Sequence, residues 1–190
     1  MKKKIIITGG LGYIGTELCK LYSGVSWNNQ IIVVDDRFIS ERVNQIRNWN
    51  MEFVHGNILD KDLINRYFKD ADVVHHLAGV TDVPRTKSES SEDKDRKIKL
   101  TAQEGMQNIL NAIDNNCKII FPSTHVVYEG IDKVKNNISE NEDLKPVLSY
   151  SSSKAINENQ LKVSGKNYVI LRLGSVYGYS TDTARIDIMP

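Results

Sequence analysis

A tyrosine and a lysine stand four residues apart in the stretch "YSSSK", which runs from Tyr150 to Lys154. On a helix this spacing puts both side chains on one face, one turn apart. A nearby ammonium favours the charged form of a phenol, so such a pair can prepare a proton acceptor near neutral pH. The same spacing also arises by chance on exposed helices, so other residues must decide between the two interpretations.

A glycine-rich stretch, "TGGLGYIG", follows a short apolar run near the start of the chain and precedes a helical pattern. Its glycines include Gly9, Gly12 and Gly15, and this spacing permits a tight turn with close approach of a pyrophosphate to the backbone. The helix that follows would offer free N–H groups and the positive end of its dipole. The stretch therefore predicts a dinucleotide-binding loop.

The carboxylate of Asp35 stands 20 residues after Gly15, at the end of the second predicted strand. In this context a carboxylate accepts hydrogen bonds from the ribose hydroxyls of the adenosine. It also repels a 2′-phosphate, which favours NAD over NADP; Asp36 supports this preference and Arg37 opposes it. We predict an NAD site, with an NADP site or an unrelated glycine-rich turn as the alternatives.

Six short apolar runs separated by helical patterns indicate an α/β fold. Because the runs lack polar alternation, they predict buried strands of a parallel, doubly wound, Rossmann-like sheet with helices on both faces. The predicted strands lie at residues 2–8, 30–36, 51–57, 71–79, 117–123 and 166–175. The clearest helical patterns lie at residues 13–24, 101–116 and 150–161.

Two local features refine this picture. The first predicted helix has apolar residues at helical spacing, namely Ile14, Leu18 and Leu21. The stretch 84–97, "PRTKSESSEDKDRK", is polar and charged, which predicts an exposed loop; a lid over the site is the functional alternative.

The bulk composition suits a folded chain of about one domain. Of its 190 residues 40% are hydrophobic and 26% charged, and the net charge is +1. Such a balance lacks the basic excess typical of nucleic-acid binding, and no apolar run is long enough to span a membrane. Cys19 and Cys117 are expected to be buried free thiols in a reducing compartment, so we expect a cytoplasmic protein.

Several motifs occur together and in order along nearly the whole chain: "TGGLGYIG", "HGNILD", "HHLAGV", "PSTHVVYEG", "ISENEDLKPVLSYSSSK" and "LRLGSVYG". With these motifs the chain resembles the extended short-chain dehydrogenase/reductase family, the NAD-dependent nucleotide-sugar epimerases and dehydratases. None of the motifs singles out one substrate. The resemblance implies NAD as cofactor and a nucleotide-sugar-like small molecule as partner. No metal site is expected, because His75 and His76 lack a third ligand at fitting spacing.

The resemblance also assigns residues to the cofactor. It places the adenine beside Asn57 and Ile58, and the ribose and phosphates beside a strand end at Leu77, Ala78 and Gly79. The full set of implied cofactor residues is Gly9, Gly12, Tyr13, Ile14, Gly15, Asp35, Asp36, Asn57, Ile58, Leu77, Ala78, Gly79, Tyr150 and Lys154.

The resemblance further implies that Thr124, Tyr150 and Lys154 are catalytic. Tyrosine has an ordinary pKa near ~10 and is a poor base at neutral pH, so Lys154 and the nicotinamide would favour its phenolate. Tyr150 would then transfer a proton to or from a substrate hydroxyl, Thr124 would orient the same oxygen, and Lys154 would also hold the nicotinamide ribose. Hydride would move between a sugar carbon and the nicotinamide.

Departures from the family pattern restrict the reaction. His125 and Val126 stand where sugar 4,6-dehydratases carry an Asp and a Glu, so dehydration is disfavoured and an epimerase or a simple oxidoreductase is expected. Ser175 and Thr101 stand where many members have Asn, which leaves the substrate contacts open.

The resemblance divides the chain unequally. Residues 1–174 would form the NAD-binding Rossmann domain, and residues 175–190 would begin a substrate-binding region that is largely missing. We expect a homodimer that associates through paired helices, including the one that carries the Tyr-x-x-x-Lys motif. A catalytically inactive dinucleotide-binding fragment and an NADP-dependent reductase remain the alternative functions.

Overall fold

The computed structural model describes residues 2–80, 91–132 and 135–178. Its centre is a six-stranded sheet in the order β3-β2-β1-β4-β5-β6, with every neighbouring pair parallel. This order confirms the predicted doubly wound sheet. The strands are β1 (Lys4–Thr8), β2 (Gln30–Asp35), β3 (Glu52–His55), β4 (Val73–His76), β5 (Lys118–Thr124) and β6 (Asn167–Leu173).

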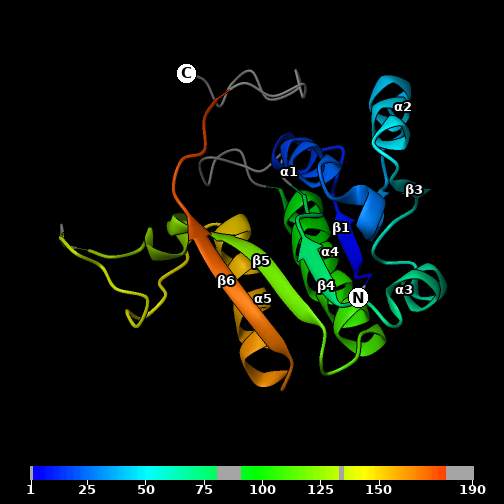
Figure 1. Ribbon diagram of the computed structural model, residues 1–190. Helices are drawn as coiled ribbons and strands as arrows, with labels where there is room; N and C mark the ends of the chain where they lie inside the picture. Colours follow the sequence, from blue (N-terminus) through cyan, green and yellow to red (C-terminus); the bar gives the residue numbers. More distant parts are fainter. Residues whose placement is uncertain (1, 81–90, 133–134, 179–190) are drawn as a thin grey trace.

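Helices cover both faces of the sheet (Figure 1). They are α1 (Tyr13–Ser23), α2 (Ser40–Asn48), α3 (Lys61–Phe68), α4 (Glu92–Ala112) and α5 (Ser149–Val163), with short 3₁₀ turns η1 (Ser26–Asn28) and η3 (His125–Tyr128). None of these described helices has the length and apolar character needed to cross a membrane.

The core forms two apolar clusters, one on each face of the sheet. Ile5 and Ile7 of β1 belong to the cluster under α1 and α2, whereas Ile6 belongs to the cluster under α3, α4 and α5. Successive strand residues point to opposite faces, so an unbroken apolar run supplies both clusters. Each fully buried isoleucine stabilises the fold by roughly 1.5–3 kcal/mol.

Helix α1 does not use its apolar pattern in the way the sequence suggests. Its buried residues are Gly15, Thr16 and Cys19, while Leu21 is 78% exposed and Ile14 is 36% exposed. A Cβ at Gly15 would lie 2.2 Å from the carbonyl oxygen of Gly9, so the helix contacts the loop through its smallest residue. That contact fixes the rotation of α1 and turns Leu21 toward solvent.

Helix α4 begins well before the predicted helix at 101–116. Residues 92–97, which were expected to lie in a loop, form the first turns of α4, and Ser91 is its N-cap. The other residues of that predicted loop, 84–90, lie outside the described residues. The hydroxyl of Ser91 accepts a hydrogen bond from the Lys94 amide at 3.4 Å, and acidic residues occupy the first turn. Acidic side chains are favourable at a helix N-terminus, which explains why this charged stretch is helical.

The two faces are covered unequally. Ile170 of β6 packs with Phe121 of β5 in the cluster under α5. On the opposite face Val169 is 38% exposed and Leu171 is 42% exposed, and their partners in register, Ile120 and Pro122, are half-buried. Among the described residues, the layer of α1 and α2 therefore stops short of β5 and β6 (Figure 1).

Candidate dinucleotide and catalytic site

The glycine loop between β1 and α1 has a backbone that only glycine can adopt without strain. Gly9 has φ +68°, and a Cβ at this position would lie 2.7 Å from the amide nitrogen of Ala78. The Gly12 amide donates to Gly9 O at 3.1 Å, and the Thr16 amide donates to Gly12 O at 2.9 Å as α1 begins. The loop is therefore already formed at the N-terminus of α1, where helix amides can receive a phosphate.

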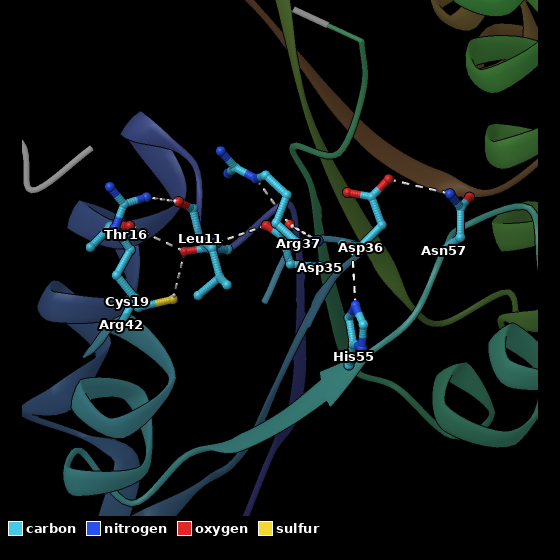
Figure 2. A network of polar contacts seen from close by, with 10 residues as sticks. Leu11, Thr16, Cys19, Asp35, Asp36, Arg37, Arg42, His55 and Asn57 are labelled. Atoms are coloured by element: carbon cyan, nitrogen blue, oxygen red, sulfur yellow. Dashed lines mark hydrogen bonds and ion pairs between the residues drawn. The ribbon is translucent and has the colours of Figure 1, made fainter. Parts of the chain in front are cut away.

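Asp35, at the end of β2, holds this loop in place. Its Oδ2 accepts the Leu11 amide at 2.9 Å, and the guanidinium of Arg42 donates to Leu11 O (Figure 2). Its Oδ1 accepts the backbone amide of Arg37 at 3.0 Å and the Nε of Arg37 at 3.3 Å. Because Asp35 is only 4% exposed, it is part of the loop's support as well as a candidate ribose ligand.

The position of Arg37 bears on cofactor choice. Its side chain is 43% exposed and forms an ion pair with Asp35. An Nη of Arg37 lies 3.5 Å from the point that a Cβ at Gly12 would occupy, so the guanidinium lies beside the glycine loop. A positive charge there offsets the repulsion between Asp35 and a 2′-phosphate, which weakens the sequence argument for NAD.

The two residues assigned to adenine have different surroundings. Asn57 Nδ2 donates to Asp36 Oδ2 at 3.3 Å, while His55 Nε2 lies 3.0 Å from Asp36 O (Figure 2). Ile58 is 5% exposed and packs in the core, where its side chain closely approaches Gly105 of α4. Any contact of Ile58 with adenine would therefore come from its main chain.

The end of β4 lies directly beside the glycine loop. The Leu77 amide donates to Thr8 O at 3.2 Å and the Ala78 amide donates to Thr8 Oγ1 at 3.1 Å, while a Cβ at Gly79 would meet only open space. The structure thus brings these three predicted residues to the edge where a dinucleotide would pass.

The two histidines of β4 have local partners. Thr8 Oγ1 accepts the Ala78 amide at 3.1 Å and lies 2.9 Å from His76 Nδ1, within hydrogen-bonding distance of the ring. Burial, followed by the charge of Lys154, lowers the pKa of His76 to about 3. His75 Nε2 lies 2.8 Å from the hydroxyl of Tyr22. Among the described residues no group of three or more His, Cys, Asp or Glu is placed to hold a metal ion.

Lys154 lies at the carboxyl end of β5. Its Nζ donates to Pro122 O at 2.8 Å, lies 4.6 Å from the ring centre of Phe121, and lies 5.9 Å from the ring centre of Tyr150. Burial lowers the pKa of Lys154 to about 8. The lysine predicted to assist Tyr150 is therefore partly desolvated and lies near it.

Thr124 ends β5, two residues after Pro122. It is 8% exposed, and its Oγ1 accepts the Val126 amide at 3.3 Å at the start of η3. Tyr150 is half-buried in the first turn of α5. Elements far apart in sequence thus bring Thr124 and Lys154 to the same end of β5, while the meeting of Thr124 with Tyr150 at one substrate oxygen stays a prediction.

A family model described as the NAD dependent epimerase/dehydratase family matches residues 5–189. The chain belongs to this family. A dTDP-D-glucose 4,6-dehydratase of Dictyostelium discoideum is 31% identical over 93% of this chain and 44% of its own length. A putative UDP-glucose 4-epimerase of Methanocaldococcus jannaschii is 31% identical over 94% of this chain and 57% of its own length.

Solved structures of the epimerase/dehydratase fold agree with the sequence matches. The crystal structure of UDP-glucose 4-epimerase from Brucella ovis in complex with NAD aligns with a TM-score of 0.74 at 27% identity, over 95% of this chain and 54% of that one. UDP-glucuronic acid 4-epimerase from Bacillus cereus in complex with NAD aligns with a TM-score of 0.73 at 27% identity, over 92% and 57%. The chain spans about half the length of the relatives it matches.

Residues outside the sequence motifs also hold the region around Lys154 in place. Glu158 has no exposed surface and lies one helical turn after Lys154. It accepts Ser123 Oγ at 2.6 Å and Arg172 Nη2 at 2.7 Å, which joins α5 to β5 and β6. Burial alone would raise the pKa of Glu158, but hydrogen bonds from Arg172 and Ser123 lower it. In the sequence, Glu158 follows Lys154 by four residues, and this spacing could have indicated that both lie on the same face of a helix.

Both cysteines are free and buried, in agreement with the sequence-based expectation. Burial is the main cause that raises the pKa of Cys19 to about 12 and that of Cys117 to about 11. Neither thiol is therefore a thiolate near neutral pH, which excludes them as nucleophiles.

Proposed function

We propose that this chain is the NAD-binding and proton-transferring half of a nucleotide-sugar epimerase or a related oxidoreductase. The observation that carries the proposal is the position of Lys154, whose Nζ bonds to Pro122 O near the end of β5 and lies beside Tyr150. The preformed glycine loop at the same edge of the sheet supplies the place for a dinucleotide. Relatives described as epimerases in complex with NAD support the choice of cofactor.

In this proposal each residue of the set has one task. NAD, when bound, would supply the hydride acceptor and donor. Tyr150 would remove the proton from a sugar hydroxyl and return it, and Thr124 would orient that oxygen. Lys154 would stabilise the phenolate by its charge, and it can also reach a ribose hydroxyl, because an ammonium has three donors and Pro122 O uses one.

Epimerisation or simple oxidation is favoured over water elimination. The matched relatives include both a 4,6-dehydratase and 4-epimerases, so relatedness does not separate the reactions. In this chain His125 Nδ1 lies 3.1 Å from Leu173 O, and Val126 follows it in η3. Neither residue is the carboxyl acid or carboxylate base that the elimination would need beside Thr124.

A second candidate cofactor, NADP, is favoured by one observation. Arg37 pairs with Asp35 and lies beside the glycine loop, so the carboxylate that should reject a 2′-phosphate is largely neutralised. An arginine near this position accommodates a 2′-phosphate in other dinucleotide sites. NAD remains the first choice because NAD occupies the related solved structures.

We also propose that the protein self-associates as a cytoplasmic homodimer through α4 and α5. Leu100 of α4 is 45% exposed and Val163 of α5 is 75% exposed, although the two helices pack side by side through Asn157, whose Nδ2 donates to Ala102 O. Large exposed apolar side chains gathered in one region often mark an interface. Light scattering that shows a clean monomer at high concentration would contradict this assembly.

Calorimetric titration with NAD and with NADP tests the cofactor assignment. We expect NAD to bind more tightly, and we expect Gly12→Val to weaken both cofactors, because a Cβ there already lies 3.1 Å from Gly9 O and would face the pyrophosphate. A folded chain that binds neither cofactor would refute the proposed function. Tighter binding of NADP would overturn the role given to Asp35.

A further inference from the structure

The amino end of α5 has no local cap. Its N-cap residue, Leu148, makes no side-chain capping hydrogen bond. Helix termini leave backbone amides without intrahelical partners, and these need acceptors from elsewhere. The helix carries Tyr150 in its first turn, so a partner that fixes this end of α5 also restrains the backbone next to Tyr150.

Glu129, which lies 19 residues before Leu148, supplies that acceptor. Its Oε1 accepts the amides of Val147 and Leu148, each at 2.8 Å, and the hydroxyl of Ser151 donates to the same oxygen. A carboxylate at a helix N-terminus is also favoured by the helix dipole. One oxygen from a distant residue therefore holds the first turn of α5, including a serine of the "YSSSK" stretch.

The other side of Glu129 is tied to the end of β5. It directly follows η3, which Thr124 begins by accepting the Val126 amide. The Glu129 amide donates to Val126 O at 3.1 Å, and the Lys145 amide donates to Val127 O at 2.9 Å. Glu129 thus has a short, hydrogen-bonded connection to Thr124 and a direct connection to the turn that carries Tyr150.

Glu129 stays ionised in this position. Burial would raise its pKa, but the hydrogen bonds from Ser151 and from the amides of Leu148 and Val147 lower it. Charge-assisted hydrogen bonds of this kind are about twice as strong as neutral ones. The neighbouring backbone is also close-packed, since a Cβ at Gly130 would lie 2.6 Å from Lys145 O.

We propose that Glu129 is a positioning residue that sets Tyr150 against Thr124 by anchoring the start of α5 to the end of β5. This rests on the proposed function, in which Tyr150 and Thr124 act on one substrate oxygen. Glu129 itself touches no reacting atom. It would act through the placement of α5, where a small displacement can lower the rate of a proton transfer by a large factor.

Two measurements on Glu129→Ala test the role. In amide hydrogen exchange, Val147 and Leu148 lose their acceptor and should exchange at least about tenfold faster, while the amides of β5 keep the parent's rates. In the presence of NAD, the titration of the Tyr150 phenol, isolated as the absorbance difference from Tyr150→Phe, should move to higher pH by about one unit, which is tenfold in proton affinity, because a displaced phenol lies farther from the Lys154 ammonium. The NAD dissociation constant should stay within about twofold.

Three further variants sharpen the result. Glu129→Gln keeps an acceptor of the same length and should retain most of the parent's behaviour, and it serves if Glu129→Ala does not fold. Ser151→Ala removes one of the three donors and should give a smaller shift of the same sign. Glu142→Ala is the matched control, because it removes a carboxylate that pairs with Lys135 in the same segment.

The outcomes separate the two proposals. A folded Glu129→Ala protein with unchanged exchange at Val147 and Leu148 and unchanged Tyr150 titration overturns the positioning role. An equal effect of Glu142→Ala would do so too. A parent chain that fails to bind NAD refutes the proposed function, whatever Glu129 does to the exchange of α5.

Discussion

At the β1–β2 end of the sheet, the glycine loop is held by steric fit and by the buried Asp35, which accepts the Leu11 amide. At the β5–β6 end, Tyr150 and Lys154 lie on a helix held by the ionised side chains of Glu129 and Glu158. The first arrangement depends mainly on close backbone contacts, such as that of Gly9 with Ala78, and its sheet is covered on both faces. The second depends mainly on carboxylate contacts, and the described residues cover its sheet on one face.

The two halves of the site should therefore respond to different perturbations. The loop should be far more sensitive to an added methyl group than to changes of salt, because close packing opposes any increase in volume. The helix α5 should tolerate modest changes of volume but not the loss of a carboxylate, because a buried partner would be left uncompensated. The following predictions test that contrast, beginning with the largest expected effect.

Glu158→Ala should destabilise the protein by roughly 3–5 kcal/mol, because it leaves Arg172 with its charge partly buried and unpaired. Urea unfolding at pH 7 measures this loss. Below about pH 4.5, the ordinary value for glutamate, the parent should lose the advantage, because a carboxyl with a lowered pKa stabilises only while it is ionised. Arg96→Ala, which removes the exposed ion pair with Asp93, is the control and should cost less than about 1 kcal/mol. A small loss of stability in Glu158→Ala at pH 7 would contradict the dependence of α5 on its carboxylates.

Gly9→Ala should destabilise the fold by about 2–4 kcal/mol, since the new Cβ meets the Ala78 backbone at 2.7 Å in a left-handed conformation. This loss should be the same at pH 7 and below pH 4.5, unlike the effect at Glu158. Gly79→Ala is the matched control for stability, because its Cβ would meet no atom within 4 Å. Thermal unfolding of both variants measures the difference, and equal melting temperatures would show that the loop is not sterically fixed.

Tyr150→Phe should lower nucleotide-sugar turnover by about a hundredfold or more, since the phenyl ring keeps the packing and loses the proton-transferring oxygen. NAD affinity, measured by calorimetry, should change little. The catalytic assignment fails if turnover is unchanged in this variant. Loss of turnover with unchanged NAD affinity would assign proton transfer to the β5–β6 half of the site and dinucleotide binding to the β1–β2 half.

Lys154→Met should weaken NAD binding and turnover but stabilise the free protein at pH 7, by about 1–3 kcal/mol, because burial disfavours the ammonium. The folded pKa is about 8 and the unfolded value is 10.5, so the unfolded chain binds more protons between these limits. Stability of the parent should therefore rise across that window relative to Lys154→Met, and the advantage of the variant should shrink. A variant that is less stable than the parent at pH 7 would contradict the cost assigned to burial.

Arg37→Ala gives the smallest expected effect. Loss of its charge beside the glycine loop should weaken NADP binding by about tenfold and leave NAD within about threefold, because only NADP carries the 2′-phosphate that an arginine here can accommodate. Competitive titration of the two dinucleotides measures the ratio. An unchanged ratio would show that selectivity does not depend on the ion pair between Arg37 and Asp35.

The sequence predicted well those features that depend on neighbouring residues. Short apolar runs could be assigned as strands because both faces of a parallel sheet need apolar side chains; the strand predicted at 117–123, for example, is observed as β5 at Lys118–Thr124. The glycine loop and Asp35 were found by their spacing. Resemblance to the family supplied Thr124 and Lys154, and the structure brings both to the end of β5.

Features that depend on contacts between distant residues needed the tertiary structure. Helix periodicity could not show that α1 buries Gly15 and Cys19 and exposes Leu21, because the approach of the helix to the loop sets its rotation. Nor could local charge show that Glu129 binds the start of α5, or that Glu158 of α5 pairs with Arg172, 14 residues away on β6. The local sequence pattern determines whether a residue lies in a helix or a strand. Its hydrogen-bond or ion-pair partner is determined only when the order of the strands brings separate elements together. In this protein the sequence alone determined the sheet and the loop, and only the folded arrangement decided what holds the tyrosine.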